Sequence, residues 1–324
     1  MRKFIFAVPF ILVLVPSISF AMGGLPQGTP EAVSGVEFVS EIGFAGAGVG
    51  QFRLPSDVYV AVHGDISTGL GDLFVADAGN ERVERFNQSG DFVYQFGQFG
   101  LNKGLFSSPR GIAVDFNNII YVSDKGNNKV AKFDIRGNFL DEFGSYGVGN
   151  GQFSEPSGIC VDNLGYVYVA DSGNDRIEKF TESGIFVNSW GGFGMGLGFF
   201  DNPQDIAVDS SRNMYISDTG NNRIQKLDEF GMPQFSFGVR GGGMGEFDGP
   251  KGIAVTDRHI YVVDSGNCRV QVFDRNGKFI VAFGSRGSGR GQFSNPTGIS
   301  IGRAGHIFVA DTDNNRVQEF KLTY

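Results

Sequence analysis

The chain has 324 residues, including 50 Gly and 33 Phe, and its 35 acidic side chains outnumber its 27 basic ones, which gives a formal net charge of −8 at pH 7. So much Gly does not suit a mainly helical protein, because Gly destabilises helix interiors. The acidic balance disfavours general binding to nucleic acid, which depends on neutralising phosphate charges.

The first 21 residues have the pattern of a signal peptide. Arg2 and Lys3 precede an apolar stretch, and small residues up to Ala21 provide a cleavage site. We expect cleavage after Ala21, a secreted or extracytoplasmic protein, and a flexible Gly- and Pro-rich leader over residues 22–33. The alternative is an uncleaved segment that anchors the protein to a membrane, although two prolines in the stretch disfavour a spanning helix.

The rest of the chain, residues 34–324, is a repeat with a period of about 47 residues. Each copy reads approximately G-x-G-x-F-x-x-P-x-G-I-A-V-D, then I-Y-V-x-D-x-G-N-x-R, then F-x-x-x-G-x-F. The first copy is longer, because it carries an extra loop over residues 62–70. The Asp of the second motif recurs at spacings of 47, 47, 47, 46 and 47 residues, as Asp77, Asp124, Asp171, Asp218, Asp264 and Asp311.

Each copy contains four short apolar runs with the composition of strands, separated by Gly, Asn and Asp. This pattern predicts an all-β protein, a six-bladed β-propeller of four-stranded antiparallel blades in a single domain. The sixth copy stops after its third strand, whereas Phe38–Gly43, before the first copy, matches Phe279–Gly284. We therefore expect the N-terminal strand to pair with the C-terminal blade and close the ring.

The motifs Asp171–Arg176, Asp218–Arg223 and Pro-x-Gly-Ile-Ala-Val-Asp resemble NHL repeats. The resemblance covers Val36–Tyr324 and implies a secreted propeller of the prokaryotic type. NHL propellers include RNA- and protein-binding modules, sensor domains and a few enzymes, so the fold does not fix the activity. RING and B-box modules, which give some NHL proteins ubiquitin-ligase activity, cannot be built from two Cys.

These observations favour a monomeric binding scaffold for a protein, a peptide or a small polar ligand, with no cofactor and with membrane contact only if the N-terminal segment is uncleaved. The two Cys, Cys160 and Cys268, fall in the third and fifth copies, too far apart for a disulfide. We expect two free thiols, with Cys160 buried and Cys268 exposed. Each repeated Asp is followed five residues later by Arg or Lys, which indicates a structural ion pair.

Binding residues are expected where the copies differ, at the channel mouth where the first strand of each blade begins. Asp57 and Asp205 should face each other across the ring, and so should Arg110 and Lys251. Mixed donors and acceptors around a concave centre suit a polar ligand, although any solvated mouth is polar. For Tyr59, which replaces an Ala, the competing interpretation is a local shift of register. The candidate ligand-binding residues are Asp57, Tyr59, Arg110, Gln204, Asp205 and Lys251.

The chain's three histidines, His63, His259 and His306, are expected on the face opposite this mouth. Three His ligands and a water in the fourth position would make a catalytic zinc site. Peptide-amidating lyases show that an NHL-like propeller can hold such a site, so the alternative function is a metal-dependent lyase or hydrolase. The structural interpretation is that these are surface histidines in loops.

Overall fold

The computed structural model describes residues 32–61 and 71–324. Residues 33–324 form one compact unit. The predicted signal peptide, most of the predicted leader and His63 lie outside the described residues. No helix within the described residues is both long enough and apolar enough to span a membrane.

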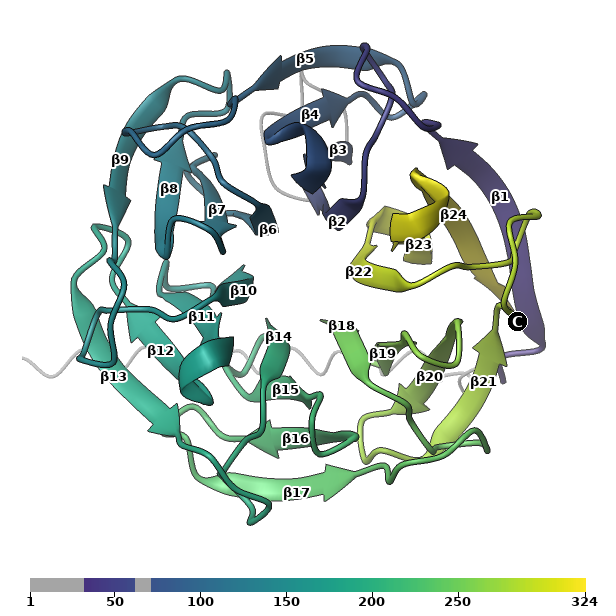
Figure 1. Cartoon of the computed structure of the whole chain (residues 1–324). Helices are drawn as coiled ribbons and strands as arrows, with labels where there is room; N and C mark the ends of the chain where they lie inside the picture. Colours follow the sequence, from purple (N-terminus) through teal and green to yellow (C-terminus); the bar gives the residue numbers. More distant parts are fainter. Residues whose placement is uncertain (1–31, 62–70) are drawn as a thin grey trace, which may run out of the picture. The chain divides into compact units, whose positions relative to one another are not determined.

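The described chain folds into six four-stranded antiparallel sheets arranged as blades around a central channel (Figure 1). Blade one contains β2 (Pro55–Ala61), β3 (Asp72–Asp77), β4 (Arg82–Phe86) and β5 (Phe92–Phe96). Blade two contains β6 (Pro109–Val114), β7 (Ile120–Asp124), β8 (Lys129–Phe133) and β9 (Phe139–Phe143). Blade three contains β10 (Pro156–Val161), β11 (Val167–Asp171), β12 (Arg176–Phe180) and β13 (Phe186–Gly191). Blade four contains β14 (Pro203–Val208), β15 (Met214–Asp218), β16 (Arg223–Leu227) and β17 (Pro233–Phe237). Blade five contains β18 (Pro250–Val255), β19 (His259–Asp264), β20 (Arg269–Asp274) and β21 (Phe279–Phe283). Blade six contains β22 (Pro296–Ile301), β23 (His306–Asp311), β24 (Arg316–Thr323) and β1 (Gly35–Ile42).

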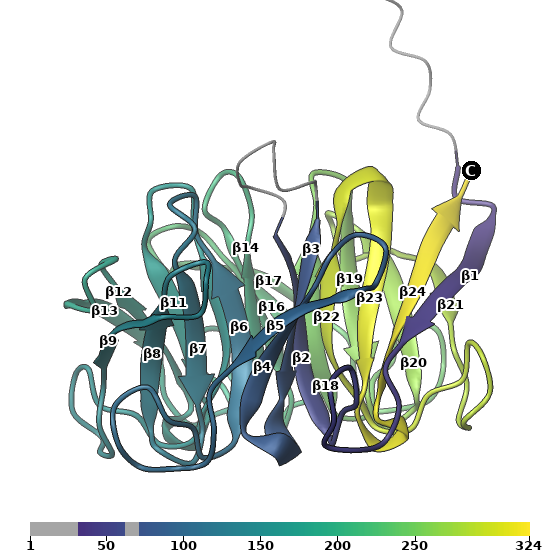
Figure 2. The ribbon, with the colours of Figure 1, turned by 90° about the horizontal axis from the view of Figure 1, so that it is seen from above.

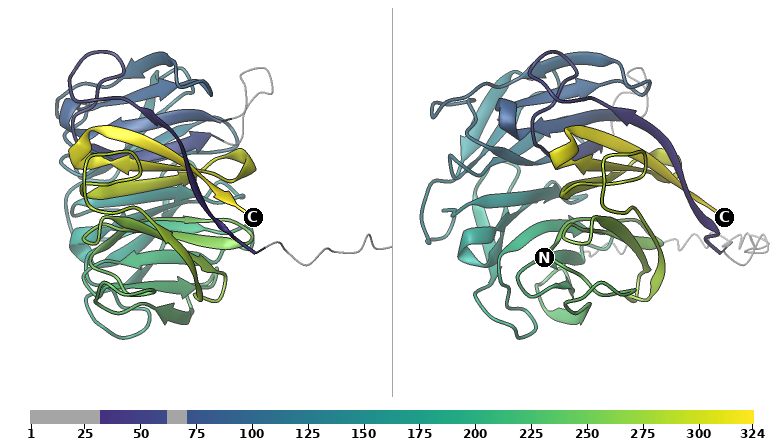
Figure 3. Two further views of the ribbon diagram at one scale, coloured as in Figure 1. Left: turned by 90° about the vertical axis from the view of Figure 1, so that its right-hand side faces the viewer. Right: turned by 45° about the vertical axis from the view of Figure 1, so that its right-hand side comes forward.

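Blade six is built from both ends of the ring. Strand β1 pairs antiparallel with β24, with Gly35 opposite Thr323 and Ile42 opposite Val317. Figure 3 shows β1 running alongside β24. The pairing is reinforced by an edge-to-face contact between Phe38 and Phe320, whose ring centroids are 5.8 Å apart. The predicted fold and its closure by the N-terminal strand are confirmed.

A repeated Phe and a repeated Gly explain much of the unusual composition. The Phe that precedes each first strand is completely buried between blades, as Phe106 illustrates. Gly97, at the end of the preceding blade, has a φ of +89°, and a Cβ there would lie 2.4 Å from the Phe106 ring. The chain therefore needs Gly at this point both for its left-handed conformation and for its contact with the ring. The equivalent Phe residues are Phe52, Phe153, Phe200, Phe247 and Phe293.

The two cysteines are free, as predicted, but Cys268 is buried rather than exposed. Cys268 is only 1% exposed, whereas Cys160 is partly exposed in the channel. Cys268 ends the turn between β19 and β20 with a φ of +53°. At the same point in the other blades the side chain reaches the next blade; for example, Asn222 accepts a hydrogen bond from the Gly249 N–H. Cys268 packs against that same seam, and so it is buried.

Candidate binding site at the strand-entrance face

One face of the ring carries the start of every first strand, and we call it the strand-entrance face. It is formed by the loops that connect one blade to the next, such as residues 192–202, and by the turns between second and third strands. In Figure 2 it is the lower edge of the ring. The opposite face carries the turns between third and fourth strands. A ligand at the channel mouth would contact the strand-entrance face.

The repeated Asp-x-Gly-Asn-x-Arg motif clamps the connecting loops to this face. In blade three Asp171 accepts hydrogen bonds from the Ser154 N–H at 2.6 Å and from the Arg176 Nε at 2.7 Å. The Arg176 guanidinium then donates to the backbone carbonyls of Val148 and Gly149 at 2.9 and 2.8 Å. Because charge-assisted bonds of this kind are strong and directional, the motif holds the loop tip in place. The repeated pairs are structural in five blades.

Blade two departs from the predicted pairing. Lys129 binds Glu142, with 2.8 Å between Nζ and Oε2, rather than Asp124. The Lys129 ammonium reaches only one loop carbonyl, that of Asn102. A single ammonium cannot span Asp124 and the loop as the fork of an Arg does. The predicted Asp124–Lys129 ion pair is therefore absent, and Asp124 keeps bonds that the other blades also have, such as that from Asn127 Nδ2 at 2.6 Å.

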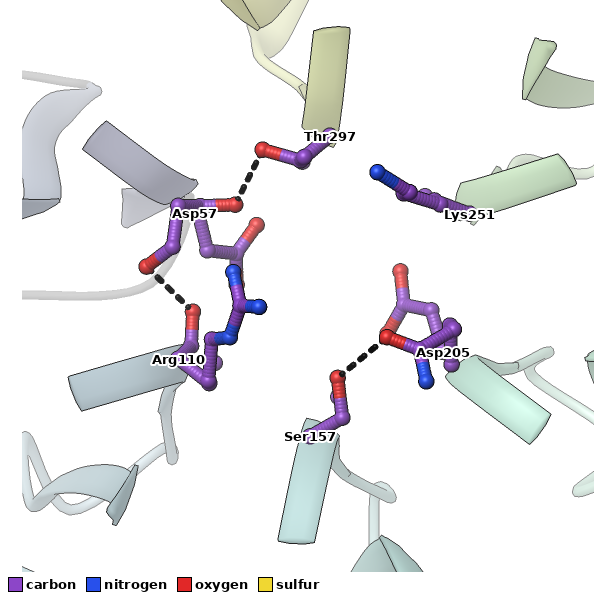
Figure 4. A pocket seen from close by; sticks show the side chains of 12 residues that line it. Asp57, Arg110, Ser157, Asp205, Lys251 and Thr297 are labelled. Atoms are coloured by element: carbon purple, nitrogen blue, oxygen red, sulfur yellow. Dashed lines mark hydrogen bonds between the residues drawn. The ribbon is translucent and has the colours of Figure 1, made fainter. Parts of the chain in front are cut away.

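The channel mouth is a small cavity of about 50 Å³ lined by two residues from each blade. Asp57, Arg110, Gln204, Asp205 and Lys251 all line it, so the structure brings together five of the six predicted ligand-binding residues. Figure 4 shows the side chains of Arg110 and Lys251 entering this cavity from opposite sides. A space of this size holds a few waters or one small functional group.

The two aspartates bridge blades beneath the mouth. Asp57 Oδ2 accepts a hydrogen bond from the Ile112 N–H in blade two at 2.9 Å, and Asp205 Oδ2 accepts one from the Ile253 N–H in blade five at 2.9 Å. Burial raises the pKa of both carboxyls, and the charge of Asp205 raises the pKa of Asp57 further. The two aspartates therefore connect neighbouring blades and also line the cavity.

Arg110 and Lys251 are cations without a bound anion. The Lys251 ammonium donates to Asn295 Oδ1 at 2.8 Å. Arg110 Nε is buried and has no hydrogen-bond partner among the described residues. Burial lowers the pKa of Arg110, and burial together with the charge of Arg110 lowers the pKa of Lys251. The two side chains are thus close enough to repel each other.

Tyr59 does not line the mouth but lies deeper, in a wider part of the channel of about 210 Å³. It pairs with Phe74 as Ala207 pairs with Tyr215 in blade four, so the strand keeps the common register and the interpretation of a register shift is wrong. Its hydroxyl donates to the Val114 carbonyl at 3.0 Å, and burial raises the pKa of Tyr59 to about 12. Its phenol is therefore occupied by a contact to the next blade.

An arc of exposed apolar side chains, not predicted from the sequence, lies on the strand-entrance face. It lies on the loops that enter blades two, three and four, and its members are between 69% and 82% exposed. We call it the apolar arc, and it comprises Phe99, Leu101, Tyr146, Val148, Phe193 and Met195. The loop that enters blade one exposes Phe44 and Val49. The loops that enter blades five and six have Arg240 and Arg286 in place of the aromatic residue, although the first of them also exposes Val239 and Met244. The only sequence signal for the arc was this difference between copies at otherwise Gly-rich positions.

The described histidines begin their strands on the opposite face. His306 Nδ1 lies 2.6 Å from Glu319 Oε1, and His259 Nδ1 lies 3.5 Å from the Tyr261 hydroxyl. Burial lowers the pKa of His259. Within residues 32–61 and 71–324, no group of three or more His, Cys, Asp or Glu side chains is placed to hold a metal ion.

Comparison with known proteins agrees with this architecture. The profile of the NHL repeat matches residues 106–133, 153–180 and 200–227, and that of a 6-bladed beta-propeller family matches residues 246–324. No curated protein matches the chain in sequence.

Solved structures with the same fold have varied activities. A streptogramin B lyase is 15% identical with a TM-score of 0.58, over 90% of this chain and all of that one. A catalytically inactive virginiamycin B lyase from Staphylococcus aureus, bound to quinupristin, is 15% identical with a TM-score of 0.58, over 89% of each chain. An auxiliary nutrient binding protein from Bacteroides ovatus is 15% identical with a TM-score of 0.63, over 89% of this chain and 77% of that one. At such identities the likeness shows the fold alone.

Proposed function

We propose that this chain, an NHL-repeat six-bladed β-propeller, is an exported scaffold that binds a peptide segment of a protein partner on its strand-entrance face. The apolar arc is the observation that carries the proposal. Large apolar side chains that are mostly exposed contribute little to the core, and a group of them on one face is typical of an interaction surface.

The form of the arc favours a peptide over a small molecule. It extends over three consecutive blades, whereas the channel mouth beside it holds only one small group. Arg176 donates to the Val148 carbonyl at 2.9 Å and Arg223 to the Met195 carbonyl at 2.7 Å, so two of the three loops that present the arc are held in place before any partner arrives. Preorganised loops reduce the entropy lost on binding.

Charge indicates the composition of the partner. Arg240 and Arg286 lie on the loops that enter blades five and six. A segment that combines apolar residues with acidic ones would match both the apolar arc and these arginines. Complementary charges of this kind add specificity and speed association.

The experiment is a selection of peptides from a displayed random library on the immobilised mature protein. We expect the selected peptides to combine apolar and acidic residues, and to bind Phe193→Ser at least tenfold more weakly than the unaltered protein. Phe230→Ser is the matched control, because Phe230 is 73% exposed, close to the 76% of Phe193, but lies in a turn of the opposite face. Equal binding to Phe193→Ser, or a loss with Phe230→Ser alone, would overturn the proposal.

Two further measurements examine other parts of the proposal. Mass spectrometry of the protein recovered outside the cytoplasm should show a mature N-terminus at Met22, and a chain beginning at Met1 in the membrane fraction would favour the anchored alternative.

Elemental analysis of the purified mature protein addresses the competing hypothesis of a metal-dependent lyase or hydrolase. Stoichiometric zinc or iron would favour the enzyme.

A further inference from the structure

The mouth of the channel brings two cations, Arg110 and Lys251, to one small cavity in which neither forms an ion pair with a described carboxylate. The Arg110 guanidinium makes no hydrogen bond or ion pair with a described residue, and its Nε is buried. The Lys251 ammonium binds one neutral side chain, Asn295. Buried polar groups without partners are rare in folded proteins, because the desolvation cost is not recovered.

We propose that the mouth is an oxyanion site, in which one carboxylate or phosphate group sits on the channel axis between Arg110 and Lys251. The inference deepens the proposed function, since a partner on the strand-entrance face would place such a group there. A guanidinium and an ammonium suit an oxyanion well, the first through its fork of N–H donors and the second as a compact charge.

The surrounding carboxylates are bound to other groups. Glu155, whose charge raises the Arg110 pKa, is ion-paired with Lys125 at 2.8 Å. Asp57 and Asp205 lie beneath the cations, and each accepts a backbone N–H of a neighbouring blade. Burial raises the pKa of both carboxyls, that of Asp205 to about 7, because the charged form is poorly solvated there.

Asp313 is the remaining carboxylate that acts on the site, and its charge raises the Lys251 pKa. Its Oδ1 accepts a hydrogen bond from Asn295 Nδ2 at 3.3 Å, so Asn295 lies between Asp313 and the ammonium. No carboxylate of the described residues is within ion-pair distance of Lys251 or Arg110. An oxyanion between the two cations would remove their mutual repulsion.

The arrangement of the mouth also favours a ligand on the axis. Chemically similar residues stand three blades apart: Arg110 opposite Lys251, and Asp57 opposite Asp205. A group on the axis would therefore lie between the two cations. The cavity of about 50 Å³ admits one such group but not a whole peptide, so the rest of the ligand would remain outside, towards the apolar arc.

The experiment is an NMR titration of the mature protein with sodium acetate and, separately, with sodium phosphate, each at an ionic strength held constant with sodium chloride. The readouts are the Arg110 Nε–Hε signal and the backbone amide signals of Gly111 and Gly252, which line the cavity. We expect saturable shifts with acetate, with phosphate or with both. The anion that saturates at lower concentration identifies the preferred oxyanion.

Arg110→Gln and Lys251→Gln should each raise the dissociation constant at least tenfold, as read from the amide signals. Arg136→Gln is the matched control, because Arg136 is an exposed cation in the turn between β8 and β9 on the opposite face. Melting temperatures of all variants show whether the ring remains folded, and either mouth variant suffices if the other unfolds. The absence of saturation with both anions, or an equal loss with Arg136→Gln, would overturn the inference. Peptide binding that is lost with Phe193→Ser in that case would leave the proposed function standing.

Discussion

The carboxylate of Asp205 occupies the space that a side chain on Gly158 would need. A Cβ on Gly158 would lie 2.0 Å from Asp205 Oδ1 and 2.6 Å from the Asp205 Cα. Asp57 lies in the same way against Gly298, whose Cβ would come within 2.2 Å of Asp57 Oδ1. An Asp at this position of a first strand therefore requires a Gly at the equivalent position of the preceding blade.

Gly158→Ala should destabilise the ring, because the clash involves the Asp205 backbone and cannot be relieved by a side-chain rotation. Overpacking of this kind costs roughly 1 to 3 kcal/mol of unfolding free energy. Gly242→Ala is the control, since a Cβ there meets nothing closer than 3.7 Å. Denaturant unfolding of the two variants measures the difference, and equal midpoints would contradict the steric argument.

The clamps predict a dependence of stability on pH. Blades one and three have Glu84 and Glu178 where blade four has Gln225, and the Gln225 amide donates to Asp218 at 2.9 Å and to the Phe199 carbonyl at 2.7 Å. An ionised Glu has no proton to donate. Glu84 and Glu178 each pair with the Arg of their own clamp, at 2.7 and 3.1 Å, but Glu178 Oε2 is buried without a hydrogen-bond partner among the described residues. Burial raises the pKa of Glu84 and of Glu178 to about 7.

A carboxyl whose pKa is raised on folding contributes most to stability below its unfolded pKa, near 4.5, and that contribution is lost as the pH rises through about 7. The double variant Glu84→Gln, Glu178→Gln should therefore gain roughly 1 to 3 kcal/mol over the unaltered protein at pH 8, and less at pH 5. The reverse change, Gln225→Glu, should lose stability as the pH rises. Unfolding curves at the two pH values measure both effects, and parallel profiles for all three proteins would rule out the explanation.

Because the N-terminal strand closes the ring, deletion of that strand should strongly lower the stability of the protein. Removal of Val36–Gly43 exposes the apolar face of blade six, leaves the β24 edge unpaired and breaks the ion pair between Arg316 and Glu41, whose atoms are 2.7 Å apart. The melting temperature should fall by ten degrees or more, on the order expected for the loss of several kcal/mol. Removal of residues 22–32 is the control and should change it little. The closure model fails if the two deletions melt at the same temperature.

The clamps should also control the mobility of the apolar arc. Arg223→Lys would retain the charge but lose the fork that binds the Met195, Gly196 and Phe199 carbonyls. We expect faster hydrogen exchange over residues 193–199 with little change elsewhere. The loop over residues 239–246, which Arg269 clamps, serves as the internal control. Unchanged exchange over residues 193–199 would show that the guanidinium does not hold the loop.

Features that recur in every copy could be predicted from the sequence. The blades, their number and the closure follow from a pattern that appears six times, so that each weak local signal is repeated. The Asp–Arg clamps were recognised for the same reason. The exception, Lys129, depends on how far one ammonium reaches, and the sequence does not encode that distance directly.

Features that depend on the direction in which a side chain points could not be predicted from the sequence. Cys268 is buried because a left-handed turn directs its side chain into the seam, and the residue type alone gives no sign of this. Asp205 was expected to be a free mouth residue, yet it also binds the Ile253 backbone in the next blade. The apolar arc was overlooked because exposed positions in Gly-rich loops have no periodicity from which exposure can be inferred.

The pairing of β1 with β24 also determines the order in which the protein can fold. The Ser34 hydroxyl donates to the Thr323 hydroxyl across 289 positions of sequence, so the first strand to be synthesised needs the last as its partner. Contacts between such distant residues form late, because the loop that they close costs the most entropy. Until the final residues are available, β1 presents an open edge, and during that interval the protein is most exposed to mispairing with other chains.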